Sequence, residues 1–100
     1  MWLWLTATAK VHAMPATIAA KRHQWMTQGK DRQLKDRCRS AQRFIVEDHT
    51  PPQVFWLLDT DDPNTANLIT DHFGDLWDIE IYHVTPQAIG QATASVPDAA

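Results

Sequence analysis

Five histidines are the side chains of this 100-residue sequence best suited to acid–base chemistry near neutral pH. No two stand four residues apart on one helix and no HxH pair occurs, so we predict no metal site. His23 lies on a predicted helix, two residues before Trp25, and His83 lies on an apolar row of a predicted strand. Each is either a hydrogen-bonded core histidine or the general base of a pocket, and both are candidate catalytic residues.

Four further side chains are candidates for binding a ligand. Trp25 and Trp77 can form aromatic walls of a pocket, and Tyr82 can donate its hydroxyl or else lie in a protein interface. Arg43 can hold a carboxylate. Arg39 stands four residues earlier, on the same side of a strand, so the two can clamp one anion or simply form an exposed basic edge.

Other signatures of chemistry are missing from the sequence. Cys38 is the lone cysteine and lies between two arginines, but no histidine stands near it in sequence, so we do not expect a nucleophile. The three glycines are isolated, and no phosphate loop, serine elbow or paired-carboxylate motif is present. We therefore predict no cofactor.

The elements that must position these residues are clearest in residues 53–84. The apolar run 54–58 predicts a strand that is covered on both sides, and residues 77–84 alternate with period two as a half-buried strand does. Between them, Asp61-Asp62-Pro63 begins a helix, because an aspartate caps the first turn and proline suits the first helical position. Gly74 is expected to end this helix in the left-handed conformation.

The first half of the chain repeats this pattern. Residues 2–9 predict an interior strand, and Pro15 starts a helix over 16–28 that Gly29 ends. We expect residues 30–38 to form a loop or an irregular extra turn. Residues 40–48 predict an edge strand, and 49–52, with two prolines, a hairpin connection.

The resulting β-α-β-β-α-β order predicts a ferredoxin-like α+β fold, with a four-stranded antiparallel sheet and two helices on one face. Right-handed crossovers place the first and third strands in the middle of the sheet. One domain over residues 1–90 and a flexible tail over 91–100 are expected. Since two helices cover only one face, a Trp-rich or Leu-rich row is left on the other, which predicts a homodimer formed through the sheet face.

A family resemblance accompanies this pattern. The segments 55–63 (FWLLDTDDP) and 74–84 (GDLWDIEIYHV) resemble the closing half of the dimeric α+β barrel superfamily, most nearly the DUF3303-type family of unknown function. The resemblance implies a sheet-to-sheet homodimer and brings no catalytic signature. The wider superfamily includes cofactor-free monooxygenases, lactone isomerases and polyketide-type cyclases.

Charge is divided along the chain. All nine Lys and Arg lie at or before Arg43, and ten of the twelve acids lie at or after Glu47, which gives net charges of +7 and −10 for residues 1–43 and 44–100. This split indicates solvated faces, attraction between protomers, or a basic patch for an anion. The basic segment 30–39 is interrupted by acids and has no aromatics, so we predict no nucleic acid partner. The apolar start is too short for a membrane span, and the lone cysteine suits the cytoplasm.

Together these features predict a small cytoplasmic dimer that binds a small aromatic or acyl ligand in the cleft between helices and sheet. Cofactor-free acid–base or monooxygenase-type chemistry is the enzymatic version of this hypothesis. The alternative is a ligand-binding, regulatory or protein-interaction module of the same fold that is not an enzyme.

Overall fold

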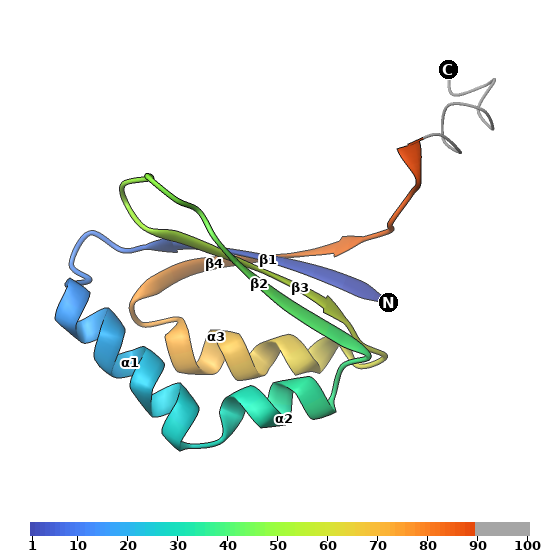
Figure 1. The fold of residues 1–100 in the computed structure, drawn as a ribbon, viewed down its shortest axis with the longest axis horizontal. Helices are drawn as coiled ribbons and strands as arrows, with labels where there is room; N and C mark the ends of the chain where they lie inside the picture. Colours follow the sequence, from blue (N-terminus) through green and yellow to red (C-terminus); the bar gives the residue numbers. More distant parts are fainter. Residues whose placement is uncertain (90–100) are drawn as a thin grey trace.

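The computed structural model describes residues 1–89, and their helices lie on one face of an antiparallel sheet with the strand order β2-β3-β1-β4 (Figure 1). The elements are β1 (Trp2–Ala9), α1 (Pro15–Thr27), α2 (Lys30–Asp36), β2 (Ser40–Ile45), β3 (Gln53–Asp59), the 3-10 helix η1 (Pro63–Ala66), α3 (Asn67–Phe73) and β4 (Trp77–Val84). This is the predicted ferredoxin-like α+β fold, with the first and third strands in the middle. The expected tail, 91–100, lies outside the described residues.

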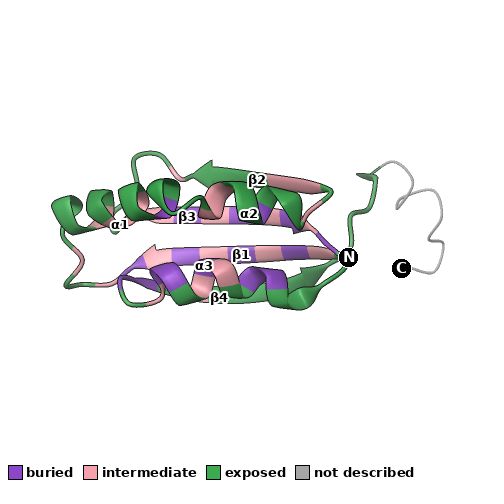
Figure 2. Cartoon of the chain, turned by 90° about the horizontal axis from the view of Figure 1, so that it is seen from below, coloured by how far each residue is buried: buried purple, intermediate pink, exposed green. Residues whose placement is uncertain are grey.

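The two central strands alternate between a buried and a half-buried face, as Figure 2 shows along β1 and β3. Leu3, Leu5 and Ala7 are fully buried beneath the helices, and the register places them opposite the buried row of β3 (Val54, Trp56, Leu58). Trp2 and Trp4 lie on the other face of β1. The leucine row therefore builds the core, and the tryptophan row is the one left without a helical cover.

Within residues 1–89, three α-helices cover the sheet instead of the predicted two, because residues 30–36 form a regular helix. Gly29 stands between α1 and α2 with φ of 69°, a left-handed conformation that glycine adopts without steric penalty. The following helix is highly charged, but Leu34 is only 4% exposed and anchors it to the core. The expectation of a loop or an irregular extra turn was wrong because one buried leucine, rather than a periodic stripe, holds α2 in place.

The start of the second helical segment follows the predicted capping. The Asp62 side chain accepts a hydrogen bond from the backbone N–H of Asn64 (2.9 Å), and Pro63 takes the first position of η1. The predicted end was wrong, since Gly74 has φ of −64° and is right-handed. A side chain at this position would bring its Cβ to 2.5 Å from the carbonyl oxygen of Thr70, so glycine is required here for space.

Several ion pairs join the basic first half of the chain to the acidic second half. Lys21 pairs with Asp75 (3.0 Å), and Arg39 pairs with Asp59 (2.8 Å) and Asp61 (2.9 Å). The divided charge thus forms contacts within a single chain. Among the described residues, no helix combines the length and apolar character needed to cross a membrane.

Candidate functional site

A groove of about 230 Å³ lies between α1, α2 and the edge strand β2, and it adjoins a smaller recess of about 20 Å³ between the helices and the sheet. Arg22, Arg43 and Trp56 line both spaces, so the two meet at these residues. We call them together the helix–sheet cleft. The groove is also lined by Asp31, Leu34, Lys35, Ala41 and Gln42, and the recess by Ile18, Val54, Phe73 and Trp77.

Helical and strand periodicity bring these side chains to one place. Ile18 and Arg22 are four residues apart on α1 and therefore share the helix face that meets the sheet. Arg43 lies opposite Trp56 in the β2–β3 pairing, and Trp56 lies opposite the buried Leu5 in the β1–β3 pairing. All three side chains consequently lie on the side of the sheet that the helices cover. Arg43 reaches the cleft from the edge, where no further strand encloses it.

The side chains of Arg22 and Arg43 form no hydrogen bond or ion pair with any other residue in the range 1–89. Burial lowers the pKa of Arg43, the positive charge of Arg22 lowers it further, and Asp31 opposes both effects. A guanidinium stays charged in proteins, so this direction means that its charge is unfavourable where it stands. The cleft mouth therefore holds positive charge that the chain does not neutralise.

The one carboxylate in the groove is already engaged. Asp31 accepts a hydrogen bond from the indole N–H of Trp25 (3.2 Å) and pairs with Lys35 (3.3 Å). Burial raises the pKa of Asp31, but the hydrogen bonds from Trp25 and Lys35 and the charges of Lys35 and Arg22 outweigh it and lower the pKa overall. The mouth of the cleft thus holds three cations, Arg22, Lys35 and Arg43, and one carboxylate, that of Asp31.

The structure brings together two of the ligand-binding candidates, because Arg43 and Trp77 line the same recess. Trp25 is 1% exposed and packs behind the cleft, where it contacts Phe73 at 5.2 Å between ring centroids. Tyr82 lies on the uncovered face of the sheet. There it donates a hydrogen bond to the Glu80 carboxylate (2.9 Å), and this bond and the charge of Glu80 raise the pKa of Tyr82.

The two candidate catalytic histidines lie outside the cleft and are exposed. His83 is opposite Leu3, so it is on the helix-covered side of β4, but six residues of extended chain, about 20 Å, separate it from Trp77. Neither ring is therefore enclosed as a core histidine or the general base of a pocket would be. Arg39 does not share the cleft with Arg43, because its side chain is hydrogen-bonded to Asp59 and Asp61. The second arginine at the cleft is Arg22 from α1.

Among residues 1–89, the buried histidine is His72, which lies in the last turn of α3. Its Nε2 lies 2.8 Å from the backbone oxygen of Lys21, and its Nδ1 lies 3.1 Å from Nζ of Lys30. A carbonyl oxygen only accepts, so Nε2 carries the proton and Nδ1 accepts from the ammonium. The spacing Ile69, His72, Phe73 in the apolar stripe of α3 was the available signal for burial.

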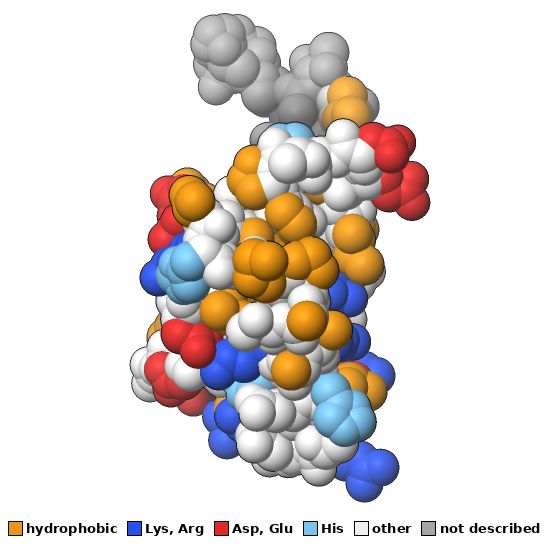
Figure 3. Space-filling view, turned by 90° about the vertical axis from the view of Figure 1, so that its left-hand side faces the viewer, with side chains coloured by type: hydrophobic (Ala, Val, Ile, Leu, Met, Phe, Trp, Pro, Cys, Tyr) orange, Lys and Arg blue, Asp and Glu red, His pale blue; other side chains and the backbone are white. Residues whose placement is uncertain are grey.

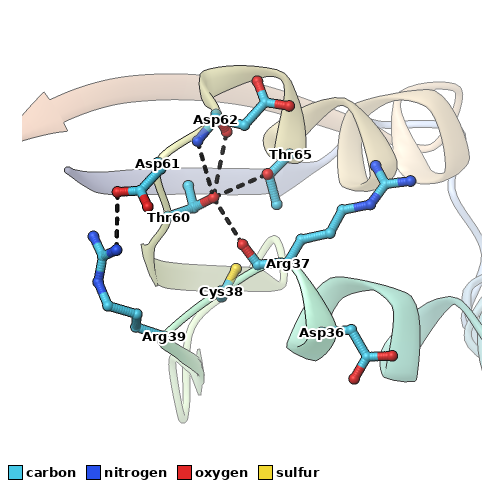
Figure 4. Close-up of a pocket in the computed structure, with 8 residues that line it drawn as sticks. All are labelled: Asp36, Arg37, Cys38, Arg39, Thr60, Asp61, Asp62 and Thr65. Carbon is cyan, nitrogen blue, oxygen red and sulfur yellow. Dashed lines mark hydrogen bonds and ion pairs between the residues drawn. The ribbon is translucent and has the colours of Figure 1, made fainter.

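A second pocket, of about 410 Å³, lies where the chain leaves α2 and β3 (Figure 4). The Thr60 hydroxyl is at its centre, where it donates to the Arg37 carbonyl (2.9 Å), accepts from the Asp62 N–H (3.2 Å) and meets the Thr65 hydroxyl at 3.0 Å. Burial, followed by the charge of Asp59, raises the pKa of the Cys38 thiol. A protonated thiol is a poor nucleophile, and these polar groups already satisfy one another. This pocket has the character of a structural junction.

Figure 3 views the end of the molecule at which the β1–α1 and β2–β3 connections lie. Hydrophobic side chains gather in the middle of this surface. Val11, Met14 and Ile45 belong to this end by their place in the chain and are exposed. Residues of the recess lie at the same end, since Val54 pairs with Ala7 and Trp77 with Ala9. The apolar part of the cleft is therefore close to an apolar surface.

No family model matches this chain, and no curated protein matches it in sequence. Solved structures do match it. The protein Atu4242 from Agrobacterium tumefaciens is 13% identical over 89% of this chain and 96% of its own, with a TM-score of 0.54. At3g17210 from Arabidopsis thaliana is 13% identical over 88% of this chain and 96% of its own, with a TM-score of 0.51. A Deinococcus radiodurans protein provisionally described as an antibiotic biosynthesis monooxygenase is 14% identical over 88% of this chain and 96% of its own, also with a TM-score of 0.51. These likenesses show that the chain shares their ferredoxin-like fold.

Proposed function

We propose that this protein binds a small aromatic or acyl ligand in the helix–sheet cleft. One observation carries the proposal: an apolar recess walled by Trp56 and Trp77 meets a groove at two arginines that have no protein partner among the described residues. Ligand sites typically combine apolar walls with a few polar groups that fix orientation. The groove, at about 230 Å³, is below the range for drug-sized ligands, which favours one ring or a short acyl chain.

We also propose that the protein is a homodimer joined through the uncovered sheet face. Trp4 lies 5.3 Å from Phe55 and 6.1 Å from Phe44 between ring centroids, and Phe44 and Tyr82 remain 43% and 45% exposed. A contiguous aromatic patch on a sheet favours a partner, and a second copy of the chain presents the same patch about a two-fold axis. A sheet-to-sheet homodimer is also what the sequence resemblance to dimeric α+β barrels implies.

Cofactor-free acid–base or monooxygenase-type chemistry is a second candidate, favoured by the description of the Deinococcus protein. His23 or His83 would then act as the base. We prefer the proposal of binding without catalysis because neither histidine ring lines the cleft. A His83→Gln variant that abolishes turnover of a bound compound without changing its affinity would establish the enzymatic role. A cytoplasmic location agrees with the lone cysteine.

A thermal-shift screen against aromatic acids, quinols and acyl thioesters tests the proposed binding. A compound that binds only the native protein raises its Tm. We expect a hit among the small aromatic or acyl compounds, and we expect Ile18→Phe, which fills the recess, to weaken it at least tenfold. The exposed control His23→Gln should retain it. No hit in the screen, or a hit that Ile18→Phe leaves unchanged, would contradict binding in the cleft.

A further inference from the structure

We propose that the helix–sheet cleft selects ligands that carry a carboxylate, and that Arg22 and Arg43 bind this group together; the inference rests on the proposed function. The two arginines come from different elements, α1 and the edge strand β2, and are among the three residues that line both the groove and the recess. They therefore stand at the boundary between a polar opening and an apolar interior. A ligand with an anionic end and an apolar body matches that boundary.

The charges at the cleft call for an anion from outside the chain. Arg22 and Arg43 repel each other, and the acid that lines the groove, Asp31, is hydrogen-bonded to Trp25 and paired with Lys35. Like charges that are partly desolvated destabilise the free protein, and an anion between them removes this cost. Binding should therefore be stronger than a single exposed ion pair would allow.

The shape of the donors favours a carboxylate among anions. A guanidinium presents N–H groups in a planar fork that matches the two oxygens of a carboxylate. The recess beside it is walled by Trp56 and Trp77, but at about 20 Å³ it admits only the edge of an apolar group, and the rest of that group lies in the groove. The volume of the groove restricts the ligand to a small acid, such as a single-ring aromatic acid or a short acyl acid.

The experiment compares benzoate with neutral benzamide, which has the same ring and nearly the same shape, by calorimetric titration at constant ionic strength. We expect benzoate to bind at least tenfold more tightly than benzamide. Arg43→Gln and Arg22→Gln should each remove this preference, and Arg43→Lys should restore only part of it, because an ammonium is not a planar fork. Arg37→Gln removes the same charge outside the cleft and should keep the preference.

The outcomes separate the two proposals. If benzamide and benzoate bind equally to the wild type, or if Arg43→Gln keeps the preference, carboxylate selection is wrong while binding in the cleft stands. If neither compound nor any member of the earlier screen binds, the proposed function fails. Inorganic phosphate that displaces benzoate at equal concentration would mean a general anion site and would also overturn the inference. The Tm of each variant shows that it is folded, and Arg43→Gln should not lower it.

Discussion

One imidazole ring, that of His72, joins three helices. It contacts the backbone of α1 through Lys21, the side chain of Lys30 at the start of α2, and the ring of Trp25, whose centroid is 5.5 Å away. Both ring nitrogens are used and the residue is only 6% exposed. A side chain that cannot reproduce these contacts loses both hydrogen bonds and the ring contact that tie α3 to α1 and α2.

Replacing this ring should therefore lower the stability of the fold. We expect His72→Ala to reduce the free energy of unfolding by about 2–5 kcal/mol, since it leaves a cavity and removes the hydrogen bonds to α1 and α2. Urea denaturation measures this change. His23→Gln, on the exposed side of α1, should change it by less than about 0.5 kcal/mol. Equal stabilities for the two variants would mean that His72 does not hold the helices together.

The sequence predicts some members of the candidate site better than others. Arg43 and Trp77 could be named because a charged or aromatic side chain on a strand has only two faces to choose between. Arg22 was not predicted as a site residue, because helical periodicity gives the face on which it lies but not the strand that this face meets. The burial of His83 was overestimated, because the strand periodicity gives its face while its distance from the helices is a tertiary property.

At the scale of elements, the junction between α1 and α2 depends on one backbone conformation. Gly29 has φ of 69°, and a Cβ added to it meets no atom within 4 Å. A substitution there should therefore destabilise the fold through the strained backbone conformation, and not through crowding by neighbouring atoms. We expect Gly29→Ala to lower the free energy of unfolding by about 1–2 kcal/mol. Gly29→Asn should lower it less, because asparagine adopts the left-handed region more readily. Thermal or urea unfolding that ranks Asn below Ala would refute this account.

The strands were predicted well, except that β2 ends at Ile45 and not at residue 48, and the helices were predicted less well, for a physical reason. β1 and β3 are covered by helices on one face and carry large apolar side chains on both, which makes their sequences unmistakable. In α2 the sequence KDRQLKD has one apolar residue, Leu34, and no periodic stripe. Its helical state depends on docking that leucine beside α1 and β2, and local sequence does not report such contacts.

At the scale of the whole molecule, the dimer should depend on apolar contact and hardly on charge. Trp4→Glu places a carboxylate within the aromatic patch and should convert a dimer of about twice 11.4 kDa into a monomer. Ala19→Glu, on the exposed side of α1, should leave the dimer intact. Light scattering measures both.

Because Lys21 and Arg39 pair within the chain, we expect no weakening of the dimer at high salt. A wild-type monomer at micromolar concentration would contradict the proposed interface.

The most direct test of ligand binding in the cleft is a benzoate titration followed through the five tryptophan indole N–H resonances by two-dimensional NMR. Trp56 and Trp77 line the cleft, and Trp2 and Trp4 lie on the uncovered sheet face. Trp25 packs behind the cleft, and its indole N–H donates a hydrogen bond to Asp31. We predict saturable shifts of the Trp56 and Trp77 resonances, with those of Trp2 and Trp4 unchanged. Shifts confined to Trp2 and Trp4, or no shift of any indole at high benzoate concentration, would contradict the binding of a small aromatic acid in the helix–sheet cleft.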